Sequence, residues 1–343
     1  MPSLPKTYRA VVQRKKDEPY SIEDVELKLP EEGQILVKVL ASGVCHSDSI
    51  VKHEIMPVLP RVPGHEICGD VVAVPDGEKD FKVGDRVGGG WHGGHCFMCS
   101  SCRSGDFVTC QNQAINGTTM DGGHAEYVLL RREAIVNIPT DIDPAEAAPL
   151  LCAGVTVFNS MRNQNAGPGD LVAIQGIGGL GHLAIQFASK LGFRVAALSS
   201  SDKKKDLAHK LGAQEYVDGS KGPQDKALSD LGGAKMIVCT APSPDVVKEL
   251  VNGLAVDGTL LVLAPVNELS IPMMPVIQKR LRVQGWPSGT AKHSEECILF
   301  SQHQGIKTMI EKFPLERADE AYENMTSGKT RFRAVLIPGL KNA

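Results

Sequence analysis

The sequence predicts an α/β protein in which a β-rich domain is joined to a domain built on a doubly wound parallel sheet. Three observations lead to this prediction. The chain has 343 residues, which suits two domains of the usual size of about 100–200 residues. Apolar runs of strand length dominate its first 150 residues, and strand-like and helix-like segments alternate after about residue 154.

The first part of the chain is predicted to form a mostly antiparallel β domain. Apolar runs at 35–40 and 70–74 predict strands, and the turn-like segment 82–87 leads into another. The alternation of the second part is lost beyond about residue 290, so we expect the C-terminal stretch to return to the first domain. The predicted domains are therefore 1–154 with 290–343, and 155–289.

The second part is predicted to contain the parallel sheet, because strands that alternate with helices are joined by crossovers. The predicted strands are the buried-type runs 171–175, 194–198, 236–240 and 260–264. The predicted helices are 180–191, 204–212 and 245–254, the first of which ends at Gly192.

Charge and composition exclude several classes of function. The chain has 37 Lys and Arg against 40 Asp and Glu, a net charge of −3, whereas proteins that bind nucleic acid or membrane surfaces carry a strong basic excess. No apolar run reaches the ~18 residues of a membrane span, and the first residues lack the apolar core of a signal peptide. We expect a cytoplasmic location, where nine cysteines need an explanation other than disulfides.

A glycine-rich segment follows the first predicted strand of the parallel sheet and precedes a helix. It reads Gly176-Ile177-Gly178-Gly179-Leu180-Gly181. In such a loop the first glycine permits a tight turn, the second lets the backbone approach a pyrophosphate, and the third lets helix and strand pack closely. The segment predicts dinucleotide binding; the alternative is a plain tight turn.

The end of the next predicted strand bears on which dinucleotide is bound. Ser199, Ser200 and Ser201 lie there, and Asp202 and Lys203-Lys204-Lys205 follow. Hydroxyls and positive charge suit the 2′-phosphate of NADP(H), whereas an acidic residue suits the ribose of NAD(H). We favour NADP(H). Two alternatives remain: Asp202 as the ribose-binding acid, or a helix cap followed by a solvated lysine face.

Four cysteines, Cys96, Cys99, Cys102 and Cys110, lie within fifteen residues. Four thiolates hold Zn²⁺ in a closed, structural site. An iron–sulfur cluster uses the same ligands, but zinc is favoured.

A second set of potential ligands is dispersed along the chain. A catalytic zinc keeps three protein ligands and one exchangeable position. Cys45, His65 and Cys152 could together supply two thiolates and an imidazole, although each alone would be weak evidence.

These motifs together resemble those of the zinc-dependent medium-chain alcohol dehydrogenases, both the yeast and fungal enzymes and the cinnamyl-alcohol dehydrogenase-like aldehyde reductases. The segments that carry the resemblance are 43–48, 64–66, 152–154, 176–181 and the four-cysteine loop. The resemblance implies a GroES-like catalytic domain, a Rossmann domain and two zinc ions per chain. It also implies a homodimer or homotetramer.

The resemblance also implies roles for individual residues. Cys45, His65 and Cys152 would ligate the catalytic zinc, with Glu66 as an alternate ligand and Asp48 orienting a ligand. His46 and Arg333 would approach the cofactor, and Ser47 would be the first proton carrier. The family usually passes the proton to a histidine at the position that Ile50 occupies here, so the proton would leave through ribose hydroxyls and water, or through His53. The residues that resemble substrate-pocket positions are Trp91, Met120 and Trp286, each of which could equally pack in a core or on the surface.

The expected function is NADPH-dependent reduction of an aldehyde to a primary alcohol. The first alternative is an NAD-dependent alcohol dehydrogenase. A second alternative is a non-catalytic zinc protein that serves assembly, which would bind one zinc and show no turnover. A third is a zinc-free quinone reductase, but such an enzyme would have no use for the ligand set Cys45, His65 and Cys152.

Overall fold

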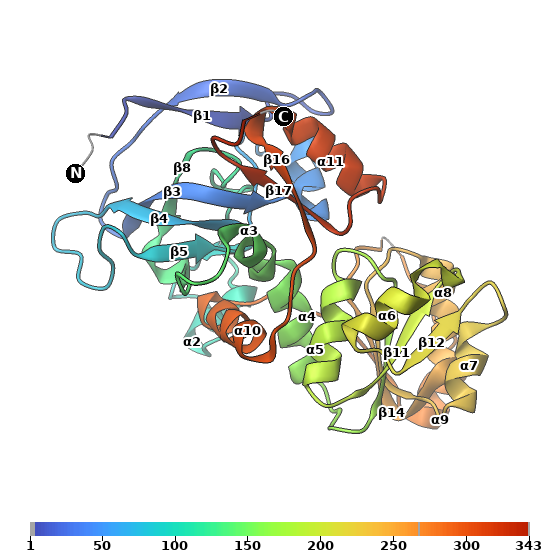
Figure 1. Cartoon of the computed structure of the whole chain (residues 1–343). Coiled ribbons are helices and arrows are strands. Elements are labelled where there is room, and N and C mark those ends of the chain that lie inside the picture. Colours follow the sequence, from blue (N-terminus) through green and yellow to red (C-terminus); the bar gives the residue numbers. More distant parts are fainter. Residues whose placement is uncertain (1–3, 267, 342–343) are drawn as a thin grey trace. The chain divides into compact units, whose positions relative to one another are not determined.

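The computed structural model describes residues 4–266 and 268–341, which divide into two compact units (Figure 1). The first unit contains the chain up to Cys152, the segment Ser288–Gln302 and the chain from Lys307 onward. The second unit contains Ala153–Pro287 and His303–Ile306. No helix in these described ranges is long and apolar enough to cross a membrane.

A seven-stranded sheet forms the centre of the first unit in the described part of the chain, with β8 beside β3 in addition to the order β16-β17-β3-β4-β5-β9. Its strands are β3 (Gln34–Gly43), β4 (Ile67–Ala73), β5 (Arg86–Gly89), β8 (Tyr127–Arg131), β9 (Ile135–Asn137), β16 (Ile310–Pro314) and β17 (Arg333–Ile337). Only the β16–β17 pair is parallel among these pairings. The C-terminal β17 pairs with β3, which brings Arg333 to the end of the strand that leads to Cys45.

Two pairs of antiparallel strands and several helices complete the first unit, apart from the end of α10, where His303 and Gln304 belong to the second unit. The paired strands are β1 (Thr7–Val12) with β2 (Ser21–Glu26) and β6 (His92–Gly94) with β7 (Ala114–Ile115). The helices are η1 (His46–Asp48), α1 (Ser49–Lys52), α2 (Ser100–Arg103), η2 (Phe107–Thr109), η3 (Arg132–Ala134), α3 (Pro144–Ala147), η4 (Ala148–Leu151), α10 (Ala291–Gln304), η7 (Leu315–Arg317) and α11 (Ala318–Thr326). Alternate residues of β3, namely Ile35, Val37 and Val39, point into one buried apolar core, as the two-residue period of a strand requires.

The second unit contains a six-stranded parallel sheet in the order β12-β11-β10-β13-β14-β15. Its strands are β10 (Leu171–Gln175), β11 (Arg194–Ser199), β12 (Glu215–Asp218), β13 (Ala234–Cys239), β14 (Leu254–Val262) and β15 (Arg282–Gly285). The chain starts in the middle, runs outward through β11 and β12, and returns to the other side at β13. The strand order therefore reverses between β10 and β13, where doubly wound folds bind their ligands.

Helices precede and join the parallel strands. They are α4 (Ala153–Arg162), α5 (Gly181–Lys190), η5 (Asp202–Lys204), α6 (Lys205–Leu211), α7 (Gln224–Asp230), α8 (Pro244–Leu250), η6 (Val251–Gly253) and α9 (Met273–Lys279). The predicted helix 245–254 is too long, because Leu254 pairs with Ala234 and begins β14. The predicted fold class is confirmed: the first unit is β-rich and the second is built on a doubly wound parallel sheet.

Candidate metal and cofactor sites

Three separate segments of the first unit bring four potential metal ligands together. Cys45 follows β3, His65 and Glu66 precede β4, and Cys152 follows η4. One ligand atom from each of these four residues lies within 4.8 Å of the others. The sulfurs of Cys45 and Cys152 are 3.9 Å apart. The structure thus places the dispersed sequence candidates in one cluster, called here the open cluster.

Asp48 lies beside His65 as a buried charge partner. Its Oδ1 lies 3.4 Å from His65 Nδ1, and its Oδ2 accepts a hydrogen bond of 2.8 Å from the backbone nitrogen of Cys45. Burial raises the pKa of the Asp48 carboxyl, but the imidazoles of His65 and His124 outweigh it and hold that pKa well below its usual range. The carboxylate is therefore ionised, as a partner of an imidazole N–H should be.

The open cluster has the donor chemistry that zinc prefers. His65 Nε2 is buried and has no hydrogen-bond partner among the described residues. Burial lowers the pKa of His65, but nearby Cys45 and Asp48 raise it well above its ordinary value. A hydrogen bond with Cys152, together with His65, holds the pKa of the Cys45 thiol well below its ordinary value against the opposing effect of burial. An unpartnered ring nitrogen beside two sulfurs fits Zn²⁺.

Glu66 belongs to the open cluster through one oxygen only. Arg333 forms a buried ion pair with Glu66 Oε1 and donates a 3.2 Å hydrogen bond to the carbonyl of Val44. Glu66 Oε2 has no partner within the described ranges. Burial raises the pKa of Glu66 to about 7, although Arg333 opposes that shift. A Cβ at Gly43 would overlap Glu66 Oε2, so the carboxylate fits only because residue 43 is glycine.

The four-cysteine loop forms a second cluster, called here the closed cluster. Ligand atoms of Cys96, Cys99, Cys102 and Cys110 lie within 4.8 Å of one another. Backbone N–H groups point at its sulfurs: Cys99 N is 3.4 Å from Cys96 Sγ, and Cys96 N is 3.4 Å from Cys110 Sγ. The N–H groups of Cys99 and Met98 help to lower the pKa of Cys96 to about 6. Four sulfurs in one cluster, two of which face backbone N–H groups, fit a structural zinc.

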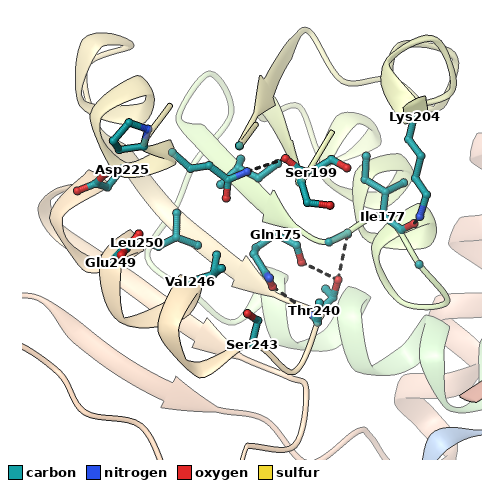
Figure 2. Close-up of a pocket in the computed structure, with 18 of the residues that line it drawn as sticks. Gln175, Ile177, Ser199, Lys204, Asp225, Thr240, Ser243, Val246, Glu249 and Leu250 are labelled. Atoms are coloured by element: carbon teal, nitrogen blue, oxygen red, sulfur yellow. Dashed lines mark hydrogen bonds between the residues drawn. The ribbon is translucent and has the colours of Figure 1, made fainter. Parts of the chain in front are cut away.

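A cavity of about 740 Å³ opens at the reversal of strand order in the second unit (Figure 2). The carboxyl ends of β10, β11 and β13 line it through Gln175, Ser199 and Thr240. Thr240 Oγ1 donates to the carbonyls of Gln175 and Gly176 at 2.8 and 3.1 Å, which fixes the first turn of the glycine loop. In Figure 2, Lys204 and Asp225 lie at opposite sides of this cavity.

The glycines of the loop have three different environments. Gly176 has φ +89°, and its Cβ would lie 2.9 Å from Ala241 Cβ. A Cβ at Gly178 would meet no atom within 4 Å, so this part of the backbone faces open space in the cavity. A Cβ at Gly181 would overlap the carbonyl oxygen of Gly176. The open side at Gly178 fits a pyrophosphate that approaches the backbone closely.

The other predicted residues of the loop divide into two groups. Ile177 lines the cavity, whereas Leu180 stands at the N-cap position of α5 and Gly179 precedes it.

Among the residues that were expected to distinguish the two dinucleotides, Ser199, Ser200 and Lys204 line the cavity. Lys204 Nζ donates to the carbonyl of Ile177 at 2.7 Å. Ser201 and Asp202 are not among the lining residues, and the carbonyl of Ser201 accepts a hydrogen bond from Tyr216.

Ser47, the expected first proton carrier, follows Cys45 closely and is half-buried in η1. His46, expected to approach the cofactor, is exposed in the same short helix, and Ile50, which stands where the family has a histidine, is half-buried in α1. His53 is exposed and already engaged: its Nδ1 lies 2.6 Å from Asp17 and its Nε2 lies 3.3 Å from the Tyr322 hydroxyl.

The three residues expected to line a substrate pocket fall into both units. The ring of Trp91 lies 5.1 Å from that of His65, edge to face at 87°, so Trp91 flanks the open cluster. Met120 is half-buried in the same unit. Trp286 follows β15 in the second unit and is half-buried.

The sequence interpretation missed His124, which lies beside Asp48. Its Nε2 is 3.6 Å from Asp48 Oδ2, and its Nδ1 is 2.8 Å from Ser42 Oγ. No motif or spacing distinguishes it, because its position depends on how distant segments pair.

Comparison with known families covers most of the chain. Residues 31–140 match the family described as the alcohol dehydrogenase GroES-like domain, and residues 179–301 match the family described as zinc-binding dehydrogenase.

Individual relatives extend the comparison to nearly the full length. Alcohol dehydrogenase patD of Penicillium expansum is 48% identical over 97% of this chain and 98% of its own length. An alcohol dehydrogenase of Geobacillus stearothermophilus is 39% identical over 92% of this chain and 94% of its own length.

Two solved structures share the fold. A cinnamyl alcohol dehydrogenase from Sorghum bicolor superposes with a TM-score of 0.89 at 28% identity, covering 98% of this chain and 100% of the other. The protein named CAD from Helicobacter pylori, solved in complex with NADP(H), superposes with a TM-score of 0.86 at 25% identity, covering 96% of this chain and 98% of the other.

Proposed function

We propose, from the premise that this chain belongs to the zinc-binding, medium-chain alcohol dehydrogenase family, that it uses NADPH to reduce an aldehyde to a primary alcohol. The chain is an oxidoreductase of the alcohol dehydrogenase type, and its substrates are small alcohols or aldehydes. The direction, the preferred cofactor and the dependence on zinc are the new elements of the proposal.

The observation that carries the proposal is that His65 Nε2 has no hydrogen-bond partner among the described residues, although His65 lies in one cluster with the sulfurs of Cys45 and Cys152. Cys45, His65 and Cys152 would hold a zinc ion, with Glu66 as the reserve ligand. When bound, zinc supplies Lewis-acid polarisation of a carbonyl oxygen and NADPH supplies hydride. The chain itself contributes two sulfur ligands, an imidazole oriented by Asp48, and the Ser47 hydroxyl as a proton carrier next to the cluster. A second zinc would be held by Cys96, Cys99, Cys102 and Cys110.

The preference for NADP(H) is supported by the residues that line the cavity. Ser199, Ser200 and Lys204 line it, whereas Asp202 does not. Donors and positive charge favour a 2′-phosphate over a free ribose hydroxyl. His46 and Arg333 are proposed as further cofactor-binding residues, and Trp91, Met120 and Trp286 as substrate-pocket residues.

Metal analysis and steady-state kinetics test the proposal together. We expect two zinc ions per chain and, in Cys152→Ser, one zinc ion and a loss of kcat/KM of about 100-fold or more with aldehyde. A screen of apolar aldehydes with NADPH and NADH should favour NADPH. A kcat/KM with NADH about tenfold higher than with NADPH would favour the NAD-dependent alternative. One zinc per chain without turnover would favour the non-catalytic alternative.

The proposed proton path runs through Ser47 to ribose hydroxyls and water. The hydrogen-bonded engagement of His53 with Asp17 and Tyr322 supports this route over His53. His53→Asn should therefore leave the pH dependence of kcat unchanged, while Ser47→Ala should lower kcat by about 100-fold. A shifted pH profile in His53→Asn would assign the proton path to that histidine.

We also propose that the chain self-associates, as a homodimer or homotetramer, through the edge of the parallel sheet. β15 is the last strand of the sheet, and its Val283 is 46% exposed. The adjacent α9 exposes Met273, Met274 and Ile277. An edge strand that no other described strand pairs with, beside exposed apolar side chains, suits pairing with a second copy. Light scattering should give at least twice the monomer mass, and Val283→Lys with Ile277→Lys should reduce it to the monomer value.

A cytoplasmic location is proposed from the cysteines. All nine are free thiols in this structure, and two groups of them form the clusters described above. Reducing conditions keep such groups available for metal. Fractionation of cells that express a tagged chain would check the location.

A further inference from the structure

Two buried imidazoles share the carboxylate of Asp48. His65 Nδ1 lies 3.4 Å from its Oδ1, and His124 Nε2 lies 3.6 Å from its Oδ2. Asp48, His65 and His124 are each only 1% exposed. Because water does not reach these groups, protein atoms must hold the carboxylate in place.

The hydrogen bond at the other ring nitrogen of His124 determines which nitrogen carries the proton that faces Asp48. Ser42 Oγ, which is fully buried, lies 2.8 Å from His124 Nδ1. When the Ser42 hydroxyl donates to Nδ1, a neutral imidazole carries its proton on Nε2, on the side of Asp48. A continuous chain of polar contacts therefore runs from Ser42 on β3 through His124 and Asp48 to His65.

The backbone holds His124 close to the segment that carries His65. His124 N donates to the carbonyl of Pro63 at 3.0 Å, and Gly123 N donates to the carbonyl of Gly64 at 2.9 Å. Gly64 has φ +100°, and a Cβ there would overlap the ring of His124. A glycine immediately before the ligand thus makes room for this second ring, so the two histidines are packed as one built unit.

We propose that His124 is a positioning residue that holds Asp48 so that His65 directs Nε2 at Cys45 and Cys152. This inference rests on the zinc site of the proposed function. His124 is not one of the four residues of the open cluster, so it would act through Asp48. Loss of its contact with Asp48 would let the carboxylate turn, and the orientation of His65 would no longer be fixed. The first consequence would be faster release of zinc from the open cluster.

Zinc release to a coloured chelator tests this role without relying on catalysis. The phase of release that is missing in Cys152→Ser identifies the zinc of the open cluster. In His124→Phe, which keeps a ring but has no donor, that phase should be about tenfold faster than in the wild type. In His124→Gln, whose side-chain amide can donate near the position of Nε2, it should be within about threefold of the wild type. Ser42→Ala keeps the imidazole but removes its hydroxyl partner, and should give an intermediate rate.

His92 offers a matched control, because it is another buried histidine of the first unit, 2% exposed, and its recorded partner is His95. His92→Phe should leave zinc release from the open cluster within about twofold of the wild type. Thermal unfolding would verify that each zinc-loaded variant is folded, and Ser42→Ala keeps the test informative if His124→Phe is not.

Three results would overturn the inference. The first is wild-type release in a folded His124→Phe. The second is equally fast release in His124→Phe and His124→Gln, which would show that only ring packing matters. The third is a wild-type protein without the phase that Cys152→Ser removes; it is distinguishable from the other two because it overturns the proposed zinc site itself.

Discussion

Arg333 and Glu66 form an ion pair that is buried inside the first unit, with 3% and 0% of the two residues exposed. The guanidinium holds Oε1 of the carboxylate, while Oε2 has no partner among the described residues. Glu66 contributes one carboxylate oxygen to the open cluster. The pair therefore keeps a carboxylate beside two sulfurs without letting it escape to solvent. The two residues are 267 positions apart, so the contact also ties β17 to the segment before β4.

Removal of one partner of this ion pair should lower the stability of the folded protein. We expect Arg333→Met to lower the free energy of unfolding by about 3 kcal/mol, because Glu66 would stay buried without its cation. The double variant Arg333→Met with Glu66→Leu should recover part of this loss, since no unpaired charge remains. Urea unfolding of the wild type, both single variants and the double variant gives the coupling energy. A change below about 1 kcal/mol in Arg333→Met would contradict the burial argument.

Two glycines of the same loop should respond in opposite ways to alanine. Gly178→Ala adds a methyl group to open space, so the unfolding temperature should not change, whereas the Kd for NADPH should rise by about tenfold or more. Gly181→Ala places a methyl group on the carbonyl of Gly176, so stability should fall by about 1–3 kcal/mol. Calorimetric titration and thermal unfolding of both variants separate the two roles. Equal loss of stability in both would refute the assignment of Gly178 to the cofactor.

The positive charge of Lys204 should matter for NADPH and not for NADH. Lys204→Glu should lower kcat/KM with NADPH by about tenfold or more, because a carboxylate would face the 2′-phosphate. The charge-matched control is Lys203→Glu, since Lys203 is exposed and is not a lining residue. Steady-state kinetics with both cofactors check the prediction. Equal losses with the two cofactors would count against a phosphate-binding role.

The buried His92 should make stability depend on pH. Burial, with the nearby charges of His95 and Arg131, lowers the pKa of His92 to about 4, whereas an unfolded histidine titrates near about 6.5. The unfolded chain therefore binds the extra proton first as pH falls from about 6.5 to about 4, and stability is lost across that window. His92→Phe should remove about 2 kcal/mol of the loss between about pH 7.5 and about pH 5. Urea unfolding of the wild type and His92→Phe at both pH values measures this loss. An equal loss of unfolding free energy in the two proteins would disprove the prediction.

Much of the parallel sheet could be predicted because its central strands are buried on both faces. The predicted strand 171–175 coincides with β10, and 194–198 lies within β11. Such strands are continuous apolar runs. β12 and β15 were missed because they are short edge strands with many half-buried or exposed residues. The first half of β14 was missed because Val256 is exposed and Asp257 has φ +59°, which interrupts the apolar pattern.

The candidate site could be predicted only where chemistry restricts the residue type. Cys45, His65 and Cys152 were identifiable because few residues bind zinc, and the structure places them in one cluster. Hydrogen bonds and ion pairs between residues of common types cannot be recognised from the sequence in this way. His124 lies 82 positions from Ser42, and it comes to Asp48 only because its segment pairs with residues 62–64. Arg333 was expected to approach the cofactor, but its ion pair with Glu66 could not be read from either local sequence.

The two clusters differ in how far apart in the sequence their ligands lie. Cys96 and Cys110 are 14 positions apart, whereas Cys45 and Cys152 are 107 positions apart. Closing the longer loop costs about 2 kcal/mol more in chain entropy, before any sheet pairing is counted. The four-cysteine loop can consequently capture its ion as soon as that short stretch leaves the ribosome, while the other set of ligands exists only after the β-rich half has folded. Metal uptake by a growing chain should therefore be sequential, and the closed cluster should bind its ion before the open cluster does.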